Sequence, residues 1–366
     1  MTEDFNPDTP MSESWPSEAR LDHAALSFGS AAITVLLLAA LSLASAVAQG
    51  VTTGSSSNDA RAGTVHIWGS PQMAELLKLY ERGFQQLHPN VRFENSLSST
   101  VSAVAGVYTK RAQIGLLGRE MWPTEAEAFV SVTGHPPKAL QVATGSYDVP
   151  KATFALMIFV PDSNPIASLT LPQLRQIFGT GSEGIKPIST WSDLGLTGVW
   201  AHRPIHIYGF RKENDKAQVF SRIVFGGHEE WSCSLVAFDN GTGANHQDAG
   251  ERILQAIATD PNGIAISNVH YMKGKVRVIP LAENADETPV TPTRTTIATR
   301  RYPLSRAVYM VIDPSDHSQS GRLAHTFLRY VLSTKGITDA AQQRDYIPLT
   351  PSIAKAQLQL LDDGAR

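Results

Sequence analysis

The sequence contains one cysteine, Cys233, among its 366 residues. A single cysteine excludes an intrachain disulfide, so the fold must be held by its core rather than by a covalent cross-link. Cys233 also lies far from the apolar segment near the N-terminus, which argues against a lipid-anchored cysteine there. Because a free cysteine behaves as a small hydrophobic residue, we expect Cys233 to be a buried or half-buried thiol.

An excess of charge of either sign is also missing. The chain has 31 Lys and Arg against 34 Asp and Glu, and its formal net charge of −3 gives no basic footprint for nucleic acid. Six of the acids but only one of the bases lie within residues 1–48, which leaves 30 bases and 28 acids beyond them, a net charge of +2. This weakly basic body is compatible with an anionic ligand and does not by itself predict one.

Motifs of common enzyme classes are absent or incomplete. No Gly-x-Ser-x-Gly elbow occurs, and residues 352–355 match Ser-x-x-Lys without the two companion motifs of that class. His228 and Glu229 lack the second histidine of a zinc-binding helix. The glycines at 241–243 form too short a run for a dinucleotide fingerprint. We therefore predict no catalytic residue, no metal ligand and no cofactor.

What the chain does contain is a regular alternation of strand-like and helix-like segments. Its length and its hydrophobic content of 42% predict a globular protein with two domains. Short apolar runs predict strands, and apolar residues at helical spacing predict the helices between them. The strands are expected at 65–68, 91–93, 114–117, 155–160, 205–208, 263–266 and 307–312, and the helices at 73–87, 101–108, 171–178, 218–225 and 323–332. This order favours an α/β fold with mainly parallel sheets.

The N-terminal segment has the pattern of a secretory signal peptide. Residues 33–43 form its apolar core, and Ala-Val-Ala at 46–48 supplies a small-residue cleavage site before Gln49. Two alternatives stay open, because the tract 24–48 is long enough to remain as a membrane anchor and Met11 is a second candidate start. We assign 1–48 as signal peptide or anchor and the Ser/Gly/Thr-rich residues 49–62 as a flexible linker. The body is expected outside the cytoplasm, in the periplasm.

Hydroxyl and cationic side chains stand where predicted strands meet helices. Such turns expose backbone N–H groups and the positive end of a helix dipole, so several of them converging on one cleft can bind an anion without a metal. Ser70 also precedes Pro71 in the position of a helix N-cap, a structural role that competes with ligand binding. The predicted ligand-binding residues are Ser70, Ser98, Ser99, Thr100, Arg119, Arg211, Asn214 and Lys216.

The order of motifs resembles that of a known receptor family. Residues 114–119 read Ile-Gly-Leu-Leu-Gly-Arg, residues 169–179 read Leu-Thr-Leu-Pro-Gln-Leu-Arg-Gln-Ile-Phe-Gly, and residues 302–306 read Tyr-Pro-Leu-Ser-Arg. These motifs, within about residues 63–350, resemble the phosphate (PstS-like) substrate-binding proteins of ABC importers. Their fold is the type II periplasmic binding protein (PBP) fold.

The resemblance implies a two-lobed α/β fold with helices flanking the sheets and a ligand cleft between the lobes. Lobe 1 is expected at 63–152 plus 302–366, and lobe 2 at 153–301. The implied function is a monomeric, non-enzymatic receptor that binds inorganic phosphate or a related oxyanion and feeds an ABC permease. The alternative is an anchored extracytoplasmic sensory or interaction protein of the same fold, whose ligand pocket has drifted or been lost.

One loop departs from the family pattern. The family's phosphate loop reads Arg-x-x-Gly-Ser-Gly-Thr, whereas this chain has Phe210 at the arginine position and Glu-Asn-Asp-Lys at 213–216. Arg211 follows one residue late. The two acids would repel an anion unless they point away, while Asn214 and Lys216 can still donate hydrogen bonds.

Overall fold

The computed structural model describes residues 62–181, 184, 186–228, 230–241 and 247–363. They belong to one compact unit that spans Ser55–Arg366. The predicted signal peptide or anchor at 1–48 and all but the last residue of the predicted linker lie outside the described residues. Within the described ranges, no helix is both long enough and apolar enough to cross a membrane.

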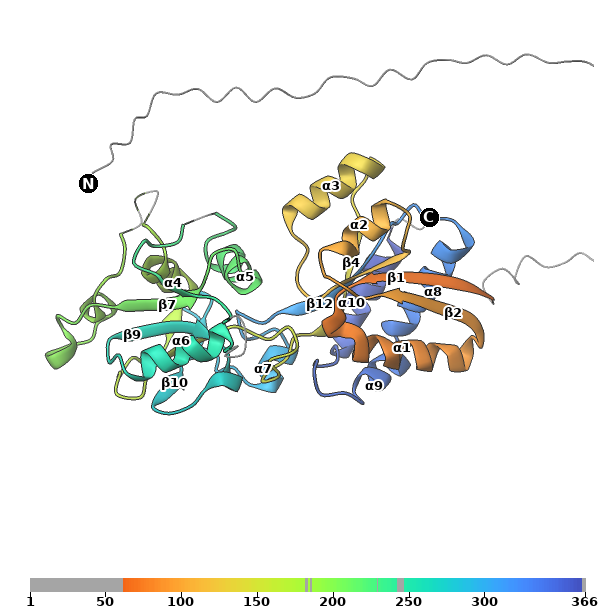
Figure 1. The fold of residues 1–366 in the computed structure, drawn as a ribbon. Helices are drawn as coiled ribbons and strands as arrows, with labels where there is room; N and C mark the ends of the chain where they lie inside the picture. The colour runs from red at the N-terminus through yellow and green to blue at the C-terminus, as the bar shows by residue number, and fades with distance from the viewer. Residues whose placement is uncertain (1–61, 182–183, 185, 229, 242–246, 364–366) are drawn as a thin grey trace, which may run out of the picture. The chain divides into compact units, whose positions relative to one another are not determined.

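The first of two five-stranded sheets is built from both ends of the described chain (Figure 1). Its strand order is β2 (Asn90–Ser96), β1 (Ala62–Gly69), β3 (Ile114–Leu117), β12 (Ala307–Ile312) and β4 (Lys138–Thr144). Strand β1 runs parallel to β2 and β3, whereas β12 runs antiparallel to β3 and β4. A late segment therefore completes a sheet that the early segments begin.

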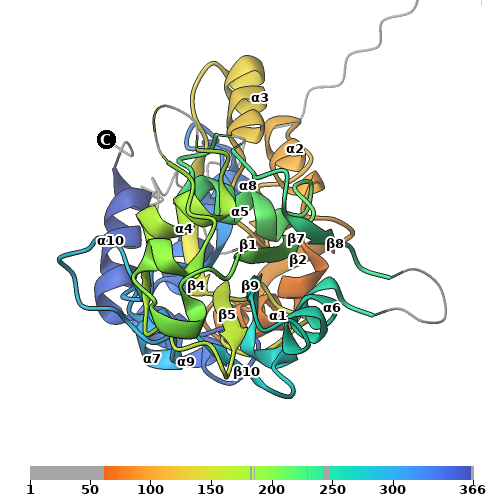
Figure 2. The ribbon, with the colours of Figure 1, turned by 90° about the vertical axis from the view of Figure 1, so that its left-hand side faces the viewer.

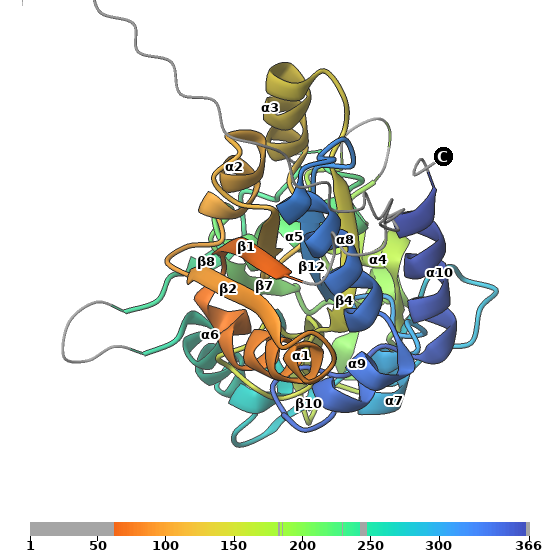
Figure 3. The ribbon, with the colours of Figure 1, turned by 90° about the vertical axis from the view of Figure 1, so that its right-hand side faces the viewer.

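Helices cover both faces of this sheet. Because successive side chains of a strand point to opposite faces, Leu116 of β3 joins one core and Leu117 joins another. The Leu116 core contains residues of α1 (Ala74–Leu87), α8 (Gln319–Val331), α9 (Thr334–Ala340) and α10 (Pro351–Asp362), seen in Figure 3. The Leu117 core contains residues of α2 (Ser102–Tyr108) and α3 (Pro123–Thr133).

The second sheet lies in the middle of the sequence. Its order is β10 (Val276–Val278), β5 (Met157–Pro161), β9 (Gly263–Ser267), β7 (His206–Phe210) and β8 (Val236–Phe238). Every residue of β5 and β9 is buried, as their continuous apolar runs predict. Figure 2 shows the helices around this sheet, namely α4 (Leu171–Phe178), α5 (Asp215–Val224) and α6 (Ala249–Ala258).

Smaller elements complete the described chain. A two-stranded parallel sheet pairs β6 (Leu169–Thr170) with β11 (Leu281–Ala282), and α7 (Arg294–Ala298) precedes the return to the first sheet. Short 3-10 helices occur at Pro71–Met73, Trp191–Leu194, Gly198–Trp200 and Val269–Tyr271.

The predicted two-lobed α/β fold is confirmed, but the sheets are mixed rather than mainly parallel. Among the described residues, each five-stranded sheet has two parallel and two antiparallel pairings. Strands β5 and β12 cause the difference. Each enters its sheet from a segment that crosses from the other sheet, whereas parallel neighbours need a crossover connection that returns the chain to the same edge.

Two segments connect the sheets and are bonded to each other. The Leu156 amide donates to the Leu304 carbonyl at 3.1 Å, and the Gly145 amide donates to the Arg306 carbonyl at 2.9 Å. In one large core, all the buried residues lie between 154 and 304, except Ile347. This core includes Tyr302 and Leu304, just past the predicted end of lobe 2 at residue 301, and the predicted lobe limits stay a proposal.

The expectation for Cys233 is wrong, because its side chain is exposed. It lies in a tight turn where the Leu235 amide donates to the Ser232 carbonyl, directly after Trp231 has formed an isolated bridge with Gly179. Trp231 is half-buried and packs against the core, with its ring centroid 5.3 Å from that of Phe220, whereas the Cys233 thiol two residues later is exposed.

Candidate functional site: an anion pocket

A pocket of about 340 Å³ collects side chains from both sheet systems. Its lining comes from the turn after β1, the loop before α2, the turn after β3, the first crossing segment, the start of α5 and the second crossing segment. Six of the eight predicted site residues line it, namely Ser70, Ser98, Ser99, Thr100, Arg119 and Lys216. Arg211 and Asn214 are not among the lining residues.

Ser70 is positioned by the close approach of strands β1 and β3. Gly69 has φ +143°, and a Cβ there would lie 2.2 Å from the Leu116 carbonyl oxygen, so only glycine allows this contact. The Ser70 amide then donates to the same carbonyl at 3.0 Å. The Ser70 hydroxyl is fully buried, makes no N-cap bond to the 3-10 helix and has no hydrogen-bond partner. Ser70 therefore occupies the predicted N-cap position ahead of Pro71, but its side chain makes no capping bond, and its hydroxyl is available to a ligand in the pocket.

The three other hydroxyls share one loop. Ser98 and Ser99 are exposed and Thr100 is half-buried. The Ser99 hydroxyl accepts from the Val101 amide at 3.2 Å, and the Ser99 carbonyl accepts from the Ser102 hydroxyl at 2.8 Å. These bonds hold the turn that leads into α2, so Ser99 combines a local role with its place in the pocket.

Arg119 lines the pocket with its charge already paired with Glu125. Its two terminal nitrogens donate to the two Glu125 carboxylate oxygens at 2.8 and 2.7 Å, and one also donates to the Glu120 carbonyl at 2.9 Å. The guanidinium carbon lies 3.8 Å from the Trp122 ring centroid. The side chain is only 6% exposed, so this bidentate pair fixes its position.

Helix α5 brings its first residues to the pocket. Asn214 is its N-cap, and the Asn214 side-chain oxygen accepts from the Lys216 amide at 3.0 Å. That bond explains why Asn214 acts on the helix rather than on the pocket. Lys216 lines the pocket, with its ammonium 5.4 Å from the Phe154 ring centroid and 3.1 Å from the Asp215 carboxylate.

Arg211 lies apart from the other predicted residues. Its side chain is 59% exposed and pairs with Asp239 at 2.8 Å and with Glu213 at 3.9 Å. Since α5 starts at Asp215, Arg211 sits ahead of the helix at the end of β7, where its guanidinium faces the β8 side. The structure does not bring it to the pocket.

The pocket's most buried cation was missed by sequence reasoning. Arg306 lines the pocket, yet its side chain is only 1% exposed. Its terminal nitrogens lie 3.2 Å from Asp215 and 3.3 Å from Glu120, while its Nε has no partner. Burial alone would lower the pKa of Arg306, but these two carboxylates raise it above the usual value. The available signal was its place in the Tyr-Pro-Leu-Ser-Arg motif at 302–306.

Thr153 and Asp215 also line the pocket without having been predicted. The Thr153 hydroxyl donates to the Gly118 carbonyl in the turn before Arg119. Burial would raise the pKa of Asp215, but the positive charges of Arg306 and Lys216 outweigh it and lower that pKa to about 2. Asp215 is therefore a carboxylate at neutral pH.

The site offers hydrogen-bond donors that suit a small anion, and its positive charges are balanced by nearby carboxylates. Hydroxyls, two guanidiniums and one ammonium meet there, and each cation has a carboxylate partner. In the described part of the chain, no group of three His, Cys, Asp or Glu side chains is placed to hold a metal ion.

Comparison with known proteins decides the family. The PBP superfamily domain matches residues 54–335, well over half of the chain. The chain belongs to the PBP superfamily. The resemblance drawn from the motifs at 114–119, 169–179 and 302–306 is thereby confirmed.

This PBP-superfamily protein is similar both to a curated protein and to solved structures. It is 29% identical over 297 residues to the phosphate-binding protein PstS of Pseudomonas aeruginosa, a match that covers 80% of this chain and 85% of that protein. Among solved structures, PstS from Borrelia burgdorferi has a TM-score of 0.52 at 15% identity, covering 78% of this chain and 99% of that one. An ABC-type phosphate transport receptor from Vibrio cholerae has a TM-score of 0.50 at 17% identity, covering 77% and 99%. Identities this low show the shared fold alone.

Proposed function

We propose that this PBP-superfamily protein is an extracytoplasmic solute-binding protein that binds phosphate or a related oxyanion for an ABC importer. The curated relative in Pseudomonas aeruginosa is named a phosphate-binding protein, and the match runs over most of both chains. The proposed role is that of a receptor, not an enzyme. We further propose that it acts as a monomer with an ABC permease as its partner.

The observation that carries the proposal is a pair of unsatisfied donors in one pocket. The Ser70 hydroxyl and the Arg306 Nε are both buried without a hydrogen-bond partner, and both residues line the pocket with Lys216. A buried donor without a partner costs roughly 1–3 kcal/mol. An oxyanion supplies acceptors for both groups, and the N-terminus of α5 beside them favours negative charge.

A second candidate function is supported by the charge balance. Each cation in the pocket already has a carboxylate partner, and Arg211 lies outside the lining. An extracytoplasmic sensory or interaction protein with a drifted or lost pocket would have this self-neutralised arrangement. Anion binding separates the two candidates.

A ligand screen tests the proposal directly. A ligand that binds only the folded state raises the midpoint of thermal unfolding, by an amount equivalent to roughly 2.7 kcal/mol at a hundredfold excess over Kd. We expect phosphate, and to a smaller extent sulfate or molybdate, to raise the midpoint, with chloride at equal ionic strength as the control. Calorimetric titration then gives the affinity. If phosphate, sulfate, molybdate and organic anions all leave the midpoint unchanged, the second candidate is favoured.

Export is part of the proposal and is tested separately. The apolar core at 33–43 and the Ala-Val-Ala site at 46–48 predict a mature chain that begins at Gln49. Mass spectrometry of the N-terminus, on protein recovered from the periplasm, should find that residue first. Recovery of the intact leader in the membrane fraction would instead support the anchor at 24–48.

A further inference from the structure

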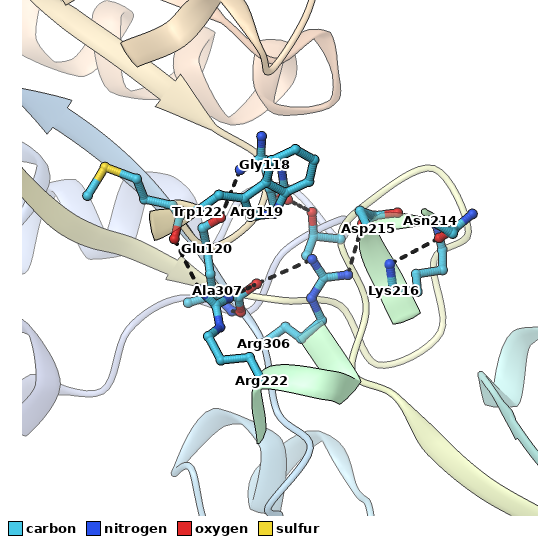
Figure 4. A network of polar contacts seen from close by, with 12 residues as sticks. Gly118, Arg119, Glu120, Trp122, Asn214, Asp215, Lys216, Arg222, Arg306 and Ala307 are labelled. Atoms are coloured by element: carbon cyan, nitrogen blue, oxygen red, sulfur yellow. Dashed lines mark hydrogen bonds and ion pairs between the residues drawn. The ribbon is translucent and has the colours of Figure 1, made fainter. Parts of the chain in front are cut away.

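Asp215, the first residue of α5, stands between the two cations that are nearest the start of this helix (Figure 4). One of its carboxylate oxygens lies 3.2 Å from an Arg306 nitrogen, and the other lies 3.1 Å from the Lys216 ammonium. All three residues line the pocket. We propose that Asp215 sets the affinity of the pocket for anions, because its carboxylate occupies the two cations that an incoming oxyanion would otherwise bind.

Arg306 has two carboxylate partners, and their surroundings differ. Glu120 is 16% exposed and does not line the pocket, and it is also held by Arg222 at 3.6 Å and by the Ala307 amide at 3.4 Å. Asp215 is 37% exposed and lines the pocket. Glu120 is therefore a fixed partner in the interior, whereas Asp215 is the partner that a ligand meets and displaces.

Charge makes this competition unavoidable. Asp215 is ionised at neutral pH, because Arg306 and Lys216 outweigh the effect of burial on its pKa. An oxyanion that enters the pocket must either displace this carboxylate from the cations or sit beside a like charge, and both weaken binding.

The inference deepens the proposed function and rests on it. The test compares Asp215→Asn with wild type by calorimetric titration with phosphate and with sulfate. We expect Asp215→Asn to bind both anions more tightly, by roughly ten- to a hundredfold, which corresponds to one freed charge-assisted hydrogen bond. Sulfate is essential, because it carries no proton at neutral pH and cannot donate to a carboxylate.

Glu213→Gln is the matched control. It removes the same charge two residues away, where the side chain is 65% exposed and does not line the pocket. We expect its affinity for both anions to stay within about twofold of wild type, since exposed charges interact weakly. Should Asp215→Asn fold poorly, Asp215→Gly removes the carboxylate without adding a side chain, and circular dichroism establishes that each variant is folded.

The outcomes separate this inference from the proposed function. If wild type binds phosphate but Asp215→Asn binds both anions no more tightly, the inference fails and the receptor function stands. If the variant loses phosphate affinity while gaining sulfate affinity, Asp215 accepts a proton from phosphate, and the inference fails. If only the variant binds anions, the inference stands and the native receptor function fails. If neither binds any anion, both fail.

Discussion

At the scale of single residues, the pocket depends on side chains whose local roles compete with ligand binding. Ser70 occupies the sequence position of an N-cap, yet its hydroxyl makes no capping bond. Asn214 was predicted as a ligand and serves as the N-cap of α5 instead. In both cases the sequence offers the same two roles, and only the direction of the side chain in the fold decides between them.

Replacing Ser70 with alanine should weaken anion binding without weakening the fold. The hydroxyl makes no bond within the protein, so its removal costs no intramolecular contact, while one lost hydrogen bond of about 1 kcal/mol corresponds to roughly fivefold in Kd. Calorimetric titration with phosphate and a thermal melt measure the two effects. Ser131→Ala is the control, because that hydroxyl donates only to the Glu127 carbonyl of α3. A drop in stability with unchanged affinity would show that Ser70 has a structural role after all.

The stability contributed by the Asp215 ion pairs should not change with pH in the neutral range. The pKa of Asp215 is lowered from 3.8 to about 2, so this contribution is complete above the higher value and is lost as pH falls through the lower one. We therefore expect the difference in unfolding midpoint between wild type and Asp215→Asn to be constant between about pH 5 and pH 8. A difference that shrinks toward pH 5 would mean that the carboxylate titrates there.

At the scale of elements, the sequence predicts several buried strands and amphipathic helices, but not β4, α6 or α10. The apolar run at 307–312 forms β12 with the same two ends. The helix expected at 323–332 overlaps α8 (Gln319–Val331) and extends one residue past its end. Hydrophobic period is a local signal, so these elements follow from neighbouring residues. The direction of β5 and β12 is not local, because it depends on which sheet each strand joins.

The ion pairs of the pocket could not be predicted from local sequence for the same reason, because their partners are far apart in the chain. Arg306 pairs with Asp215 across 91 positions and with Glu120 across 186. Arg211, which the family pattern favoured, pairs with Asp239 at the surface. The sequence does not reveal whether the partner of a charged residue is a ligand or a carboxylate. Six predicted site residues therefore line the pocket, whereas Arg211 and Asn214 lie outside its lining.

The junction of β1 and β3 should be intolerant of any side chain at Gly69. A methyl group there would lie 2.2 Å from the Leu116 carbonyl oxygen, and φ of +143° is itself unfavourable for other residues. We expect Gly69→Ala to lower the free energy of unfolding by roughly 2–4 kcal/mol, measured by urea denaturation. Gly134→Ala is the control, because Gly134 also has positive φ but no atom within 4 Å of the added group, and should cost about 1–2 kcal/mol. Equal losses would mean that backbone conformation, not the close approach, sets the requirement.

At the scale of the whole molecule, the pocket and the connection between the sheets share a residue. The Arg306 side chain lines the pocket, and its carbonyl accepts from the Gly145 amide of the other crossing segment. A ligand that replaces Asp215 as the partner of Arg306 therefore acts on a side chain whose backbone belongs to the second crossing segment. Ligand binding and the relation between the two lobes should be coupled through this residue.

Closure on the ligand is the expected consequence. Two bodies joined by a pair of crossing segments can bend at those segments with small changes in backbone angles. An anion that bridges Ser70 of one sheet system and Lys216 of the other stabilises the closed arrangement by its differential contacts. Small-angle scattering should therefore show a smaller radius of gyration at saturating phosphate than in chloride of equal ionic strength. Ser70→Ala should show the same decrease only at higher phosphate, in proportion to its weaker affinity. An unchanged radius at a saturation verified by calorimetry would mean that the anion binds without bending the connection.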